Sequence, residues 1–219
     1  MTKTNHGKRK PLFAVVDKDQ LRIFDLSKKK RRSLQRGAIV GGGNWRDSAT
    51  EVMSLSLCHA QAVVGSEHYF RVILPNEPTS YFFGVTSHKS ACEFVDTINY
   101  WAARVSKVPM RGSVGNMEYG FSTVPAGTKV YDWSPPLLPM GVSESAESAQ
   151  LEAHREHLEG LRLELTELES LTRSPPPTKG WQNWCAKSAY LQKEIGKFAL
   201  FVESLTIAEM RAGVLAVRK

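Results

Sequence analysis

The sequence predicts an α+β protein in which an antiparallel β-sheet comes first and helices follow. Three observations predict this class. Short apolar runs separated by turn residues fill residues 11 to 85. One amphipathic stretch follows at residues 87 to 105, with apolar side chains three and four positions apart. Residues 143 to 217 then carry two heptad-spaced seams separated by Pro175-Pro176-Pro177.

Six short strands are expected in the first part. The runs PLFAVV and QLRIFDL flank the turn Asp17-Lys18-Asp19, and EVMSLSLCHA, QAVVG, HYFRVILP and TSYFFGV follow in order, with Pro75-Asn76-Glu77-Pro78 as a turn. Between the second and third runs lies SKKKRRSLQRGAIVGGGNWRDSAT, which is too polar and glycine-rich for a core element and is expected to be mobile. Its Gly41-Gly42-Gly43 is not followed by the Gly-Lys-Ser/Thr of a phosphate-binding loop, so flexibility is favoured over nucleotide binding.

Ser87 is expected to cap a helix that runs to about Val105 and closes the barrel formed by the strands. Its core face consists of apolar residues at helical spacing: Ala91, Phe94, Val95, Ile98, Trp101, Ala102 and Val105. Residues 106 to 142 hold many Pro and Gly residues, with four aromatic residues among them: Tyr119, Phe121, Tyr131 and Trp133. An extended segment pinned to a surface by these aromatics is favoured, and a free linker is the alternative.

The last part of the chain is expected to form an antiparallel helical hairpin, docked near the sheet, rather than a parallel dimeric coiled coil. Residues 144 to 172 hold 8 acidic and 2 basic residues, whereas residues 173 to 219 hold 3 acidic and 8 basic ones. Opposite charges on the two arms favour their pairing within one chain. The two seams are Leu151, Leu158, Leu161, Leu165 and Leu168, and Trp184, Leu191, Ile195, Phe198, Val202 and Leu205.

The positive charge is concentrated at one end of the chain. Residues 1 to 36 hold 12 Lys and Arg against 3 Asp and Glu, a balance of +9, while the remaining 17 basic and 19 acidic residues give −2. This pattern indicates an anionic partner, which could be a phosphorylated lipid, a nucleic acid or an acidic protein. The alternative is a solubilising or nuclear-localisation run.

Several other functions find no support in the sequence. Three widely spaced cysteines form no disulfide or zinc pattern, and no metal site or other cofactor is expected. His154 and His157 lie one helical turn apart without a third ligand nearby and are expected on a solvated helix face. No nucleophile, base and orienting carboxylate stand in register, so no enzyme is expected.

Aromatic residues do not alternate with the basic run, which makes nucleic acid an unlikely partner. No apolar run is long enough to span a membrane, and MTKTNHGKRK lacks the apolar core of a secretory signal, so a cytoplasmic protein is expected.

The order of these elements resembles a pleckstrin homology (PH) domain. With its tail included, the chain is similar to the carboxy-terminal half of the Pleckstrin-and-Sec-seven-domain family of Arf guanine-nucleotide exchange factors, including fungal members. The stretches that carry this resemblance are LSLCHAQAVV, HYFRVILPNEPTSYFFGVTSHKSACEFVDTINYWAARVS, SPPLLPMGVS and the helix from Lys187 to Leu205. The resemblance implies a PH-like antiparallel β-barrel at 1–107, an extended connector at 108–142 and a helical hairpin at 143–219.

The resemblance also implies a function. The chain would be a non-catalytic membrane-targeting and regulatory module that binds phosphoinositide, with phosphatidylinositol 4,5-bisphosphate the favoured headgroup, at the plasma membrane. Arg and Lys suit this role because they supply charge-assisted donors to phosphate oxygens. The lipid-binding residues implied are Lys8, Arg9, Lys10, Arg22, Lys28, Lys29, Lys30, Arg31 and Arg32. The alternative function is a protein-interaction module that binds an Arf GTPase, actin or another regulator through the barrel and the hairpin.

The sequence departs from the family pattern in four places. No counterpart is evident for the first strand of the barrel, which would precede Lys8. Pro11 occupies the usual second basic position of the following strand, and Phe94 stands where a PH helix typically carries tryptophan. The catalytic exchange domain of the family is absent from these residues, so exchange activity would belong to a longer parent protein.

Overall fold

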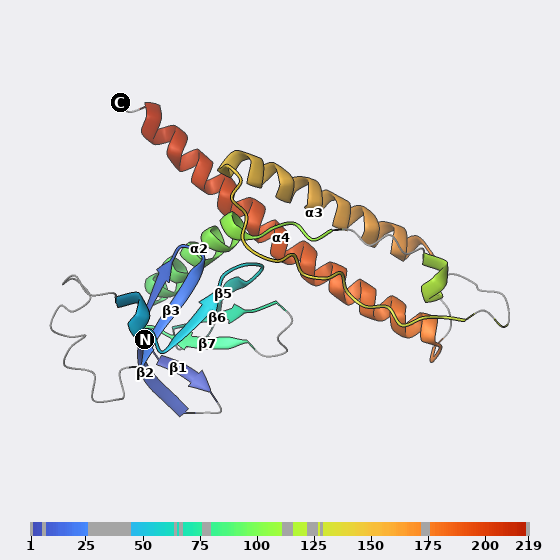
Figure 1. Cartoon of the computed structure of the whole chain (residues 1–219), viewed down its shortest axis with the longest axis horizontal. Coiled ribbons are helices and arrows are strands. Elements are labelled where there is room, and N and C mark those ends of the chain that lie inside the picture. Colours follow the sequence, from blue (N-terminus) through green and yellow to red (C-terminus); the bar gives the residue numbers. More distant parts are fainter. Residues whose placement is uncertain are drawn as a thin grey trace. The chain divides into compact units, whose positions relative to one another are not determined.

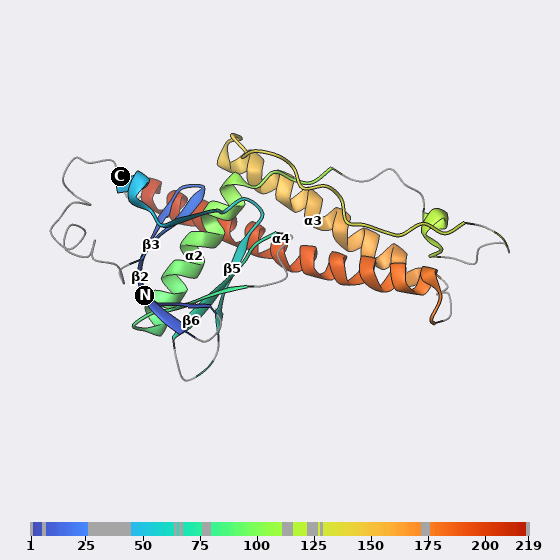
Figure 2. The ribbon, with the colours of Figure 1, turned by 60° about the horizontal axis from the view of Figure 1, so that its bottom comes forward.

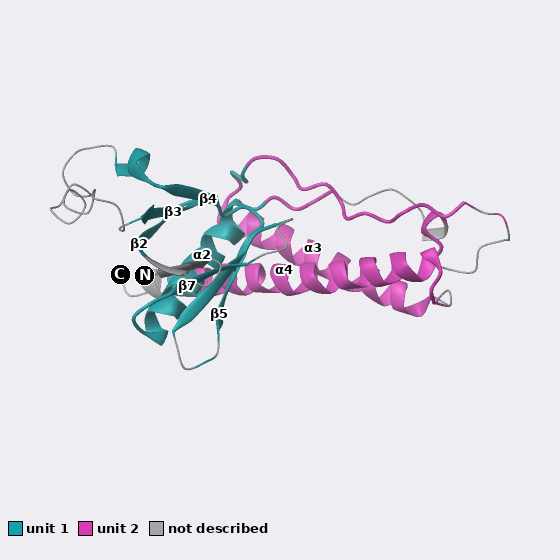
Figure 3. Ribbon diagram, turned by 90° about the horizontal axis from the view of Figure 1, so that it is seen from below, with its two compact units in different colours: residues 1–106, 142–144, 210–219 teal, residues 107–141, 145–209 magenta. Residues whose placement is uncertain are grey.

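The computed structural model describes residues 2–5, 8–25, 45–63, 65, 68–75, 80–110, 116–121, 127, 129–171 and 176–217; within these, the side chains of residues 2–5, 8–10, 116–117 and 214–217 are not described. The chain divides into two compact units (Figure 3). Unit 1 comprises residues 1–106, 142–144 and 210–219, and unit 2 comprises residues 107–141 and 145–209. Within the described part of the chain, no helix combines the length and apolar character needed to cross a bilayer.

The described residues of unit 1 include seven antiparallel strands. Helices follow the strands along the chain, and the predicted α+β class is confirmed (Figure 1). Hydrogen bonding places the strands in the order β4-β3-β2-β1-β7-β6-β5. Their bounds are β1 Thr2–Asn5, β2 Lys8–Asp17, β3 Gln20–Asp25, β4 Glu51–Ser54, β5 His59–Val63, β6 Tyr69–Ile73 and β7 Tyr81–Gly84.

The expectation that the first strand is missing was wrong. Thr2–Asn5 forms β1, which pairs with β2 on one side and with β7 on the other. The four residues TKTN contain no large apolar side chain, so they give no alternating hydrophobic signal. Backbone pairing to two neighbouring strands forms this strand, and such pairing leaves no trace in the sequence pattern.

The run EVMSLSLCHA was also expected to form one strand, but the structure divides it. β4 ends at Ser54, Leu57 adopts a left-handed backbone with φ 58°, and β5 begins at His59. Leu55, Leu57 and Cys58 are all buried, so the apolar pattern continues through the turn and conceals it. A single run of apolar residues therefore supplies two strands at opposite edges of the strand order.

Helix α2 (His88–Val105) forms as predicted and packs against β5 and β6 (Figure 2). The Ser87 hydroxyl accepts a hydrogen bond from Ser90 N at 3.1 Å, which satisfies one of the free amides of the first turn. Phe94, in the position typical of tryptophan, stacks on Phe70 with 5.3 Å between ring centroids. Phe70 in turn stacks on Phe83, so the ring at position 94 extends an aromatic column in the core.

Two polar side chains of α2 hold the chain at and just before β5. Asn99 is 4% exposed, accepts a hydrogen bond from Ala60 N at 2.7 Å and donates one to Ala60 O at 3.0 Å. Ser106, just after the helix, accepts a hydrogen bond from Leu57 N at 2.6 Å. Because β5 lies at one end of the strand order, these bonds occupy backbone groups that a further strand would otherwise pair with.

Unit 2 contains helix α3 (Glu147–Ser170) and helix α4 (Lys179–Val217) as far as Glu209, and these helices pair in an antiparallel manner. Trp184 donates from its indole nitrogen to Leu168 O, Lys187 pairs with Glu164, and His157 packs against Phe198. Residues farther along α4 thus contact residues earlier in α3. The predicted intramolecular hairpin is confirmed, and the proline run lies between its two helices in sequence.

The expectation that His154 and His157 lie on a solvated helix face was wrong. Both are buried, and His154 is fully inaccessible to solvent. The His154 ring lies 5.3 and 5.4 Å from the rings of Phe198 and Phe201, and its Nε2 lies 3.0 Å from Gln150 Nε2. Their spacing places these histidines on the same face as the leucine seam, where large rings on α4 cover them.

The connector is pinned to the hairpin by its aromatic residues, as predicted. A 3-10 helix, η2 (Asn116–Tyr119), lies within it, and Phe121 is fully buried. Trp133 packs on Tyr190 with 5.5 Å between centroids. Asn183 of α4 donates to the carbonyl oxygens of Tyr119 and Tyr131 and accepts from Trp133 N. One buried side-chain amide therefore fixes two separate segments of the connector.

Candidate functional site

The predicted basic residues near the start of the chain lie at one end of the β2–β3 hairpin. Lys8, Arg9 and Lys10 begin β2, where they pair with Asn5, Thr4 and Lys3 of β1. Leu12 pairs with Asp25, the last residue of β3, so the chain leaves β3 at the same end of the hairpin. Lys28, Lys29, Lys30, Arg31 and Arg32 follow directly in sequence and lie outside the described residues. The points at which both basic groups join the sheet are therefore neighbours.

Arg22 lies toward the other end of this hairpin. It pairs with Val15, five residues along β2 from Lys10, which is about 17 Å of extended strand. Lys18, which has φ 53° and lies in the turn between β2 and β3, is nearer to Arg22 in sequence than Lys10 is. The structure thus does not bring Arg22 together with Lys8, Arg9 and Lys10.

The Arg22 guanidinium is engaged within the sheet. Its three nitrogens donate to Asp17 Oδ2 at 3.1 Å, to Arg46 O at 3.0 Å and to Gln20 Oε1 at 2.5 Å, and its side chain is 15% exposed. We call Asp17, Gln20, Arg22 and Arg46 the Asp17 cluster. All three guanidinium nitrogens of Arg22 therefore have acceptors before any ligand binds.

Asp17 is the centre of this cluster. Arg46 donates to both of its oxygens, at 2.6 and 3.0 Å, and Arg22 donates to one of them. The Arg46 hydrogen bond is the main cause that lowers the pKa of the Asp17 carboxyl below its ordinary value of 3.8, against desolvation, which raises it. Asp17 in turn raises the pKa of the Arg46 guanidinium. The carboxylate stays ionised and fixes two arginines on one surface of the sheet.

The chain that returns to the sheet at residue 45 is fastened there. The 3-10 helix η1 (Trp45–Ser48) packs through Trp45 on Phe24 with 6.2 Å between centroids, and the Arg46 guanidinium lies 4.9 Å from the Trp45 ring. Thr50 N donates to Ile23 O, and Asp25 N donates to Thr50 Oγ1. Both ends of the segment that carries the Lys28–Arg32 run are thus anchored on β3. Nothing in the sequence pattern indicated the pairing of Trp45 and Arg46 with the sheet.

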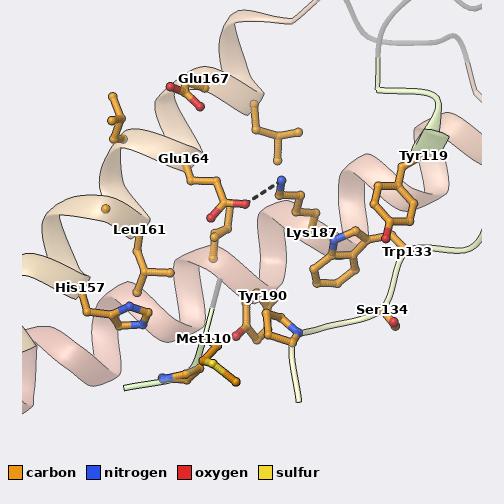
Figure 4. Close-up of a pocket in the computed structure, with 16 residues that line it drawn as sticks. Met110, Tyr119, Trp133, Ser134, His157, Leu161, Glu164, Glu167, Lys187 and Tyr190 are labelled. Carbon is orange, nitrogen blue, oxygen red and sulfur yellow. Dashed lines mark ion pairs between the residues drawn. The ribbon is translucent and has the colours of Figure 1, made fainter. Parts of the chain in front are cut away.

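Unit 2 contains a cavity of about 330 Å³ that sequence reasoning missed (Figure 4). Its walls come from three separate segments: the connector, α3 and α4. Lys187 lies across it and pairs with Glu164 at 2.7 Å. The residues that matter for its chemistry are Tyr119, Trp133, Glu164, Glu167, Lys187 and Tyr190. Among the described residues, no three His, Cys, Asp or Glu side chains are grouped to hold a metal ion.

Seven antiparallel strands with a C-terminal helix across β5 and β6 constitute a PH-like sheet fold, and a helical hairpin follows it. Comparison with known proteins agrees with this class. The chain is 29% identical over 149 residues to a PH and SEC7 domain-containing protein of the fission yeast Schizosaccharomyces pombe, a match that covers 56% of this chain and 16% of that protein. The matched region thus spans a small part of the relative's length. No family model matches the chain.

Proposed function

We propose that this chain is a non-catalytic, membrane-targeting and regulatory module of an Arf guanine-nucleotide exchange factor. It binds phosphoinositide or other anionic lipid through the basic end of its PH-like unit, at the cytoplasmic face of the plasma membrane. The observation that carries the proposal is the similarity to a PH and SEC7 domain-containing protein, which falls on a chain with a PH-like strand order. Exchange activity is assigned to a longer parent protein rather than to these residues.

The charge distribution supports anionic lipid as the partner. Of the 12 Lys and Arg in residues 1 to 36, eight either begin β2 (Lys8, Arg9 and Lys10) or follow the end of β3 in sequence (Lys28 to Arg32). Each Lys or Arg near an anionic leaflet contributes about 1 kcal/mol, so Lys28 to Arg32 would together contribute about 5 kcal/mol. That attraction holds a peripheral protein on a membrane without a stereospecific pocket.

We assign the lipid contact to Lys8, Arg9, Lys10 and the run from Lys28 to Arg32, and we assign Arg22 to the fold. The support for this division is the position of Arg22 about 17 Å along the hairpin and its three internal acceptors. A phosphate at Arg22 would have to displace Asp17 or Gln20.

Co-sedimentation of the full chain with liposomes tests the proposal. Vesicles of neutral lipid, of neutral lipid with phosphatidylserine, and of neutral lipid with phosphatidylinositol 4,5-bisphosphate at matched surface charge are compared. The proposal predicts binding to both anionic compositions and weaker binding as salt shortens the Debye length. Tighter binding to the phosphoinositide at matched charge indicates a pocket, and equal binding indicates a basic patch. Failure to bind either composition would contradict the proposal.

A second function, binding of a protein partner, is favoured by one observation. The connector exposes large apolar side chains in the sequence PPLLPM, where Leu137 is 91% and Met140 is 90% exposed. Such residues are depleted on surfaces that only contact water and are frequent at interfaces. Binding of the chain to an Arf GTPase in its GTP and GDP states, and to filamentous actin, tests this function. Leu137→Ser with Met140→Ser should reduce binding, and Val52→Ser in unit 1 is the exposed apolar control.

A further inference from the structure

The cavity of unit 2 contains polar groups that the fold does not use. The carboxylate of Glu167 on α3 lines it, and among the described residues this carboxylate has no ion-pair partner. The hydroxyl of Tyr190 on α4 likewise has no hydrogen bond within the described part of the chain. Glu164, one turn before Glu167, is already paired with Lys187. The lining of the cavity therefore includes one exposed carboxylate, Glu167, and one half-buried hydroxyl, Tyr190, that an entering group can contact.

Aromatic rings form much of the remaining wall. Trp133 and Tyr190 lie with 5.5 Å between their centroids at an interplanar angle of 56°, and Tyr119 lines the same cavity (Figure 4). The faces of these rings carry partial negative charge, which attracts cations. A carboxylate combined with several ring faces is the arrangement that proteins use to recognise ammonium groups.

The cavity already contains one cationic group of the chain, the ammonium of Lys187. Lys187 is nearly buried, pairs with Glu164 at 2.7 Å and lies with its Nζ 5.2 Å from the centroid of the Phe121 ring. Its surroundings are thus a carboxylate and an aromatic face. The pKa of Tyr190 is raised by burial and by the charges of Glu194 and Glu164, which agrees with a negative potential here.

We propose that this cavity binds an organic cation, an ammonium or guanidinium group on a short apolar stem. The cation pairs with the Glu167 carboxylate and lies against the rings of Trp133 and Tyr190, while the stem fills the apolar part formed by Leu161, Leu168 and Leu191. At about 330 Å³ the cavity is near the lower end of ligand pockets, so it suits a group of side-chain size. A Lys or Arg side chain of a peptide and a choline-type group share this chemistry.

Titration of the full chain, observed through its tryptophan indole NH signals in NMR spectra, tests the proposal without any membrane. The four probes are choline, its uncharged isostere 3,3-dimethylbutan-1-ol, N-acetyl-lysine methylamide and N-acetyl-arginine methylamide. At least one cationic probe should shift the Trp133 signal, identified by its loss in Trp133→Phe, and the uncharged isostere should bind at least about fivefold more weakly than choline.

Glu167→Gln with Glu169→Gln as its matched control isolates the charge. Glu169 is an exposed glutamate on the same helix that does not line the cavity. Glu167→Gln should weaken binding of the cationic probe about fivefold and leave the melting temperature unchanged, because it removes no internal ion pair. Glu169→Gln should change neither quantity.

Each outcome decides the proposal. Preference for choline assigns the site to a trimethylammonium group, and preference for the lysine or arginine probe assigns it to a peptide side chain; either result supports cation recognition. Binding of choline that its uncharged isostere matches, unchanged binding of the cationic probe by Glu167→Gln, or no binding of any cationic probe overturns it.

Discussion

At the scale of single residues, one carboxylate determines what two arginines can do. Asp17 accepts from Arg22 and from two nitrogens of Arg46, so both basic residues serve as structural groups. Counting charges in the sequence treats Arg22 as equivalent to Lys28. The structure separates them, because Arg22 has an acidic neighbour five positions earlier that the strand register places on the same face.

Asp17→Asn should lower the free energy of unfolding at pH 7 by about 1 to 2 kcal/mol, because it removes the charge from a hydrogen-bonded ion pair. The pKa of Asp17 is lowered in the folded state, so its contribution is fully present above the ordinary value of 3.8 and is lost as the pH falls through the folded value. Urea unfolding of wild type and variant should therefore converge as the solution is acidified below pH 4. Asp96→Asn, on the exposed side of α2, is the control, and an equal loss for both would show that the cluster adds no stability.

Arg22→Ala should destabilise unit 1 by about 1 to 2 kcal/mol, since it removes the donor to Gln20 and one of the donors to Asp17, which keeps only its hydrogen bonds from Arg46. The variant should distinguish phosphatidylinositol 4,5-bisphosphate from phosphatidylserine as well as the wild type does, when liposome binding is measured well below the melting temperature. Selective loss of phosphoinositide binding with normal stability would instead make Arg22 a lipid contact.

At the scale of elements, the sequence predicted those that bury a continuous apolar stripe. Helix α2 and the α3–α4 hairpin were predictable because apolar residues recur at helical spacing and a capping serine or a proline run marks their ends. β1 was not predictable because TKTN has no apolar face, and backbone pairing to two strands forms it. The burial of His154 was not predicted because histidine is a polar residue type, and only the structure shows that Phe198 and Phe201 cover it.

Asn99→Ala should destabilise unit 1 by about 2 to 3 kcal/mol, because it leaves the amide and the carbonyl of Ala60 without partners in a buried site. Hydrogen exchange gives the local measurement, in which the amide of Ala60 should lose protection. Asp96→Ala, one turn earlier on the exposed side of the helix, should stay within about 0.5 kcal/mol of wild type. Retained protection at Ala60 in Asn99→Ala would show that α2 does not hold this edge strand.

At the scale of the whole molecule, the chain should be monomeric. The seam of α3 is covered by α4 of the same chain through Trp184, Lys187 and Phe198, which leaves less apolar surface for a second copy. Tethering keeps the partner helix at high effective concentration. Sedimentation equilibrium should give 24.4 kDa at all loading concentrations. A concentration-dependent dimer that disappears when residues 143 to 219 are deleted would make the hairpin an oligomerisation element.

The two candidate sites differ in how far a sequence can reveal them. The basic site is concentrated in 36 consecutive residues, so a local count of charges finds it. The cavity is assembled from the connector, α3 and α4, and each wall alone resembles an ordinary helix face or loop. Trp133 and Glu167 line the same cavity only because Asn183 fixes the connector against α4. Sites of this kind require the tertiary structure.

The most direct test of the central claim reverses five charges in two places. One variant changes Lys28, Lys29, Lys30, Arg31 and Arg32 to Glu, and the matched control changes five exposed basic residues elsewhere, namely Lys89, Lys107, Lys129, Lys193 and Arg211. Both variants shift the net charge from +7 by five reversals of −2 each, to −3. Co-sedimentation with phosphoinositide-containing liposomes should fall at least about tenfold for the first variant and much less for the control, because about 5 kcal/mol of attraction comes from one run. Equal losses in the two variants would reduce the effect to net charge, and retained binding after reversal of Lys28 to Arg32 would contradict the account.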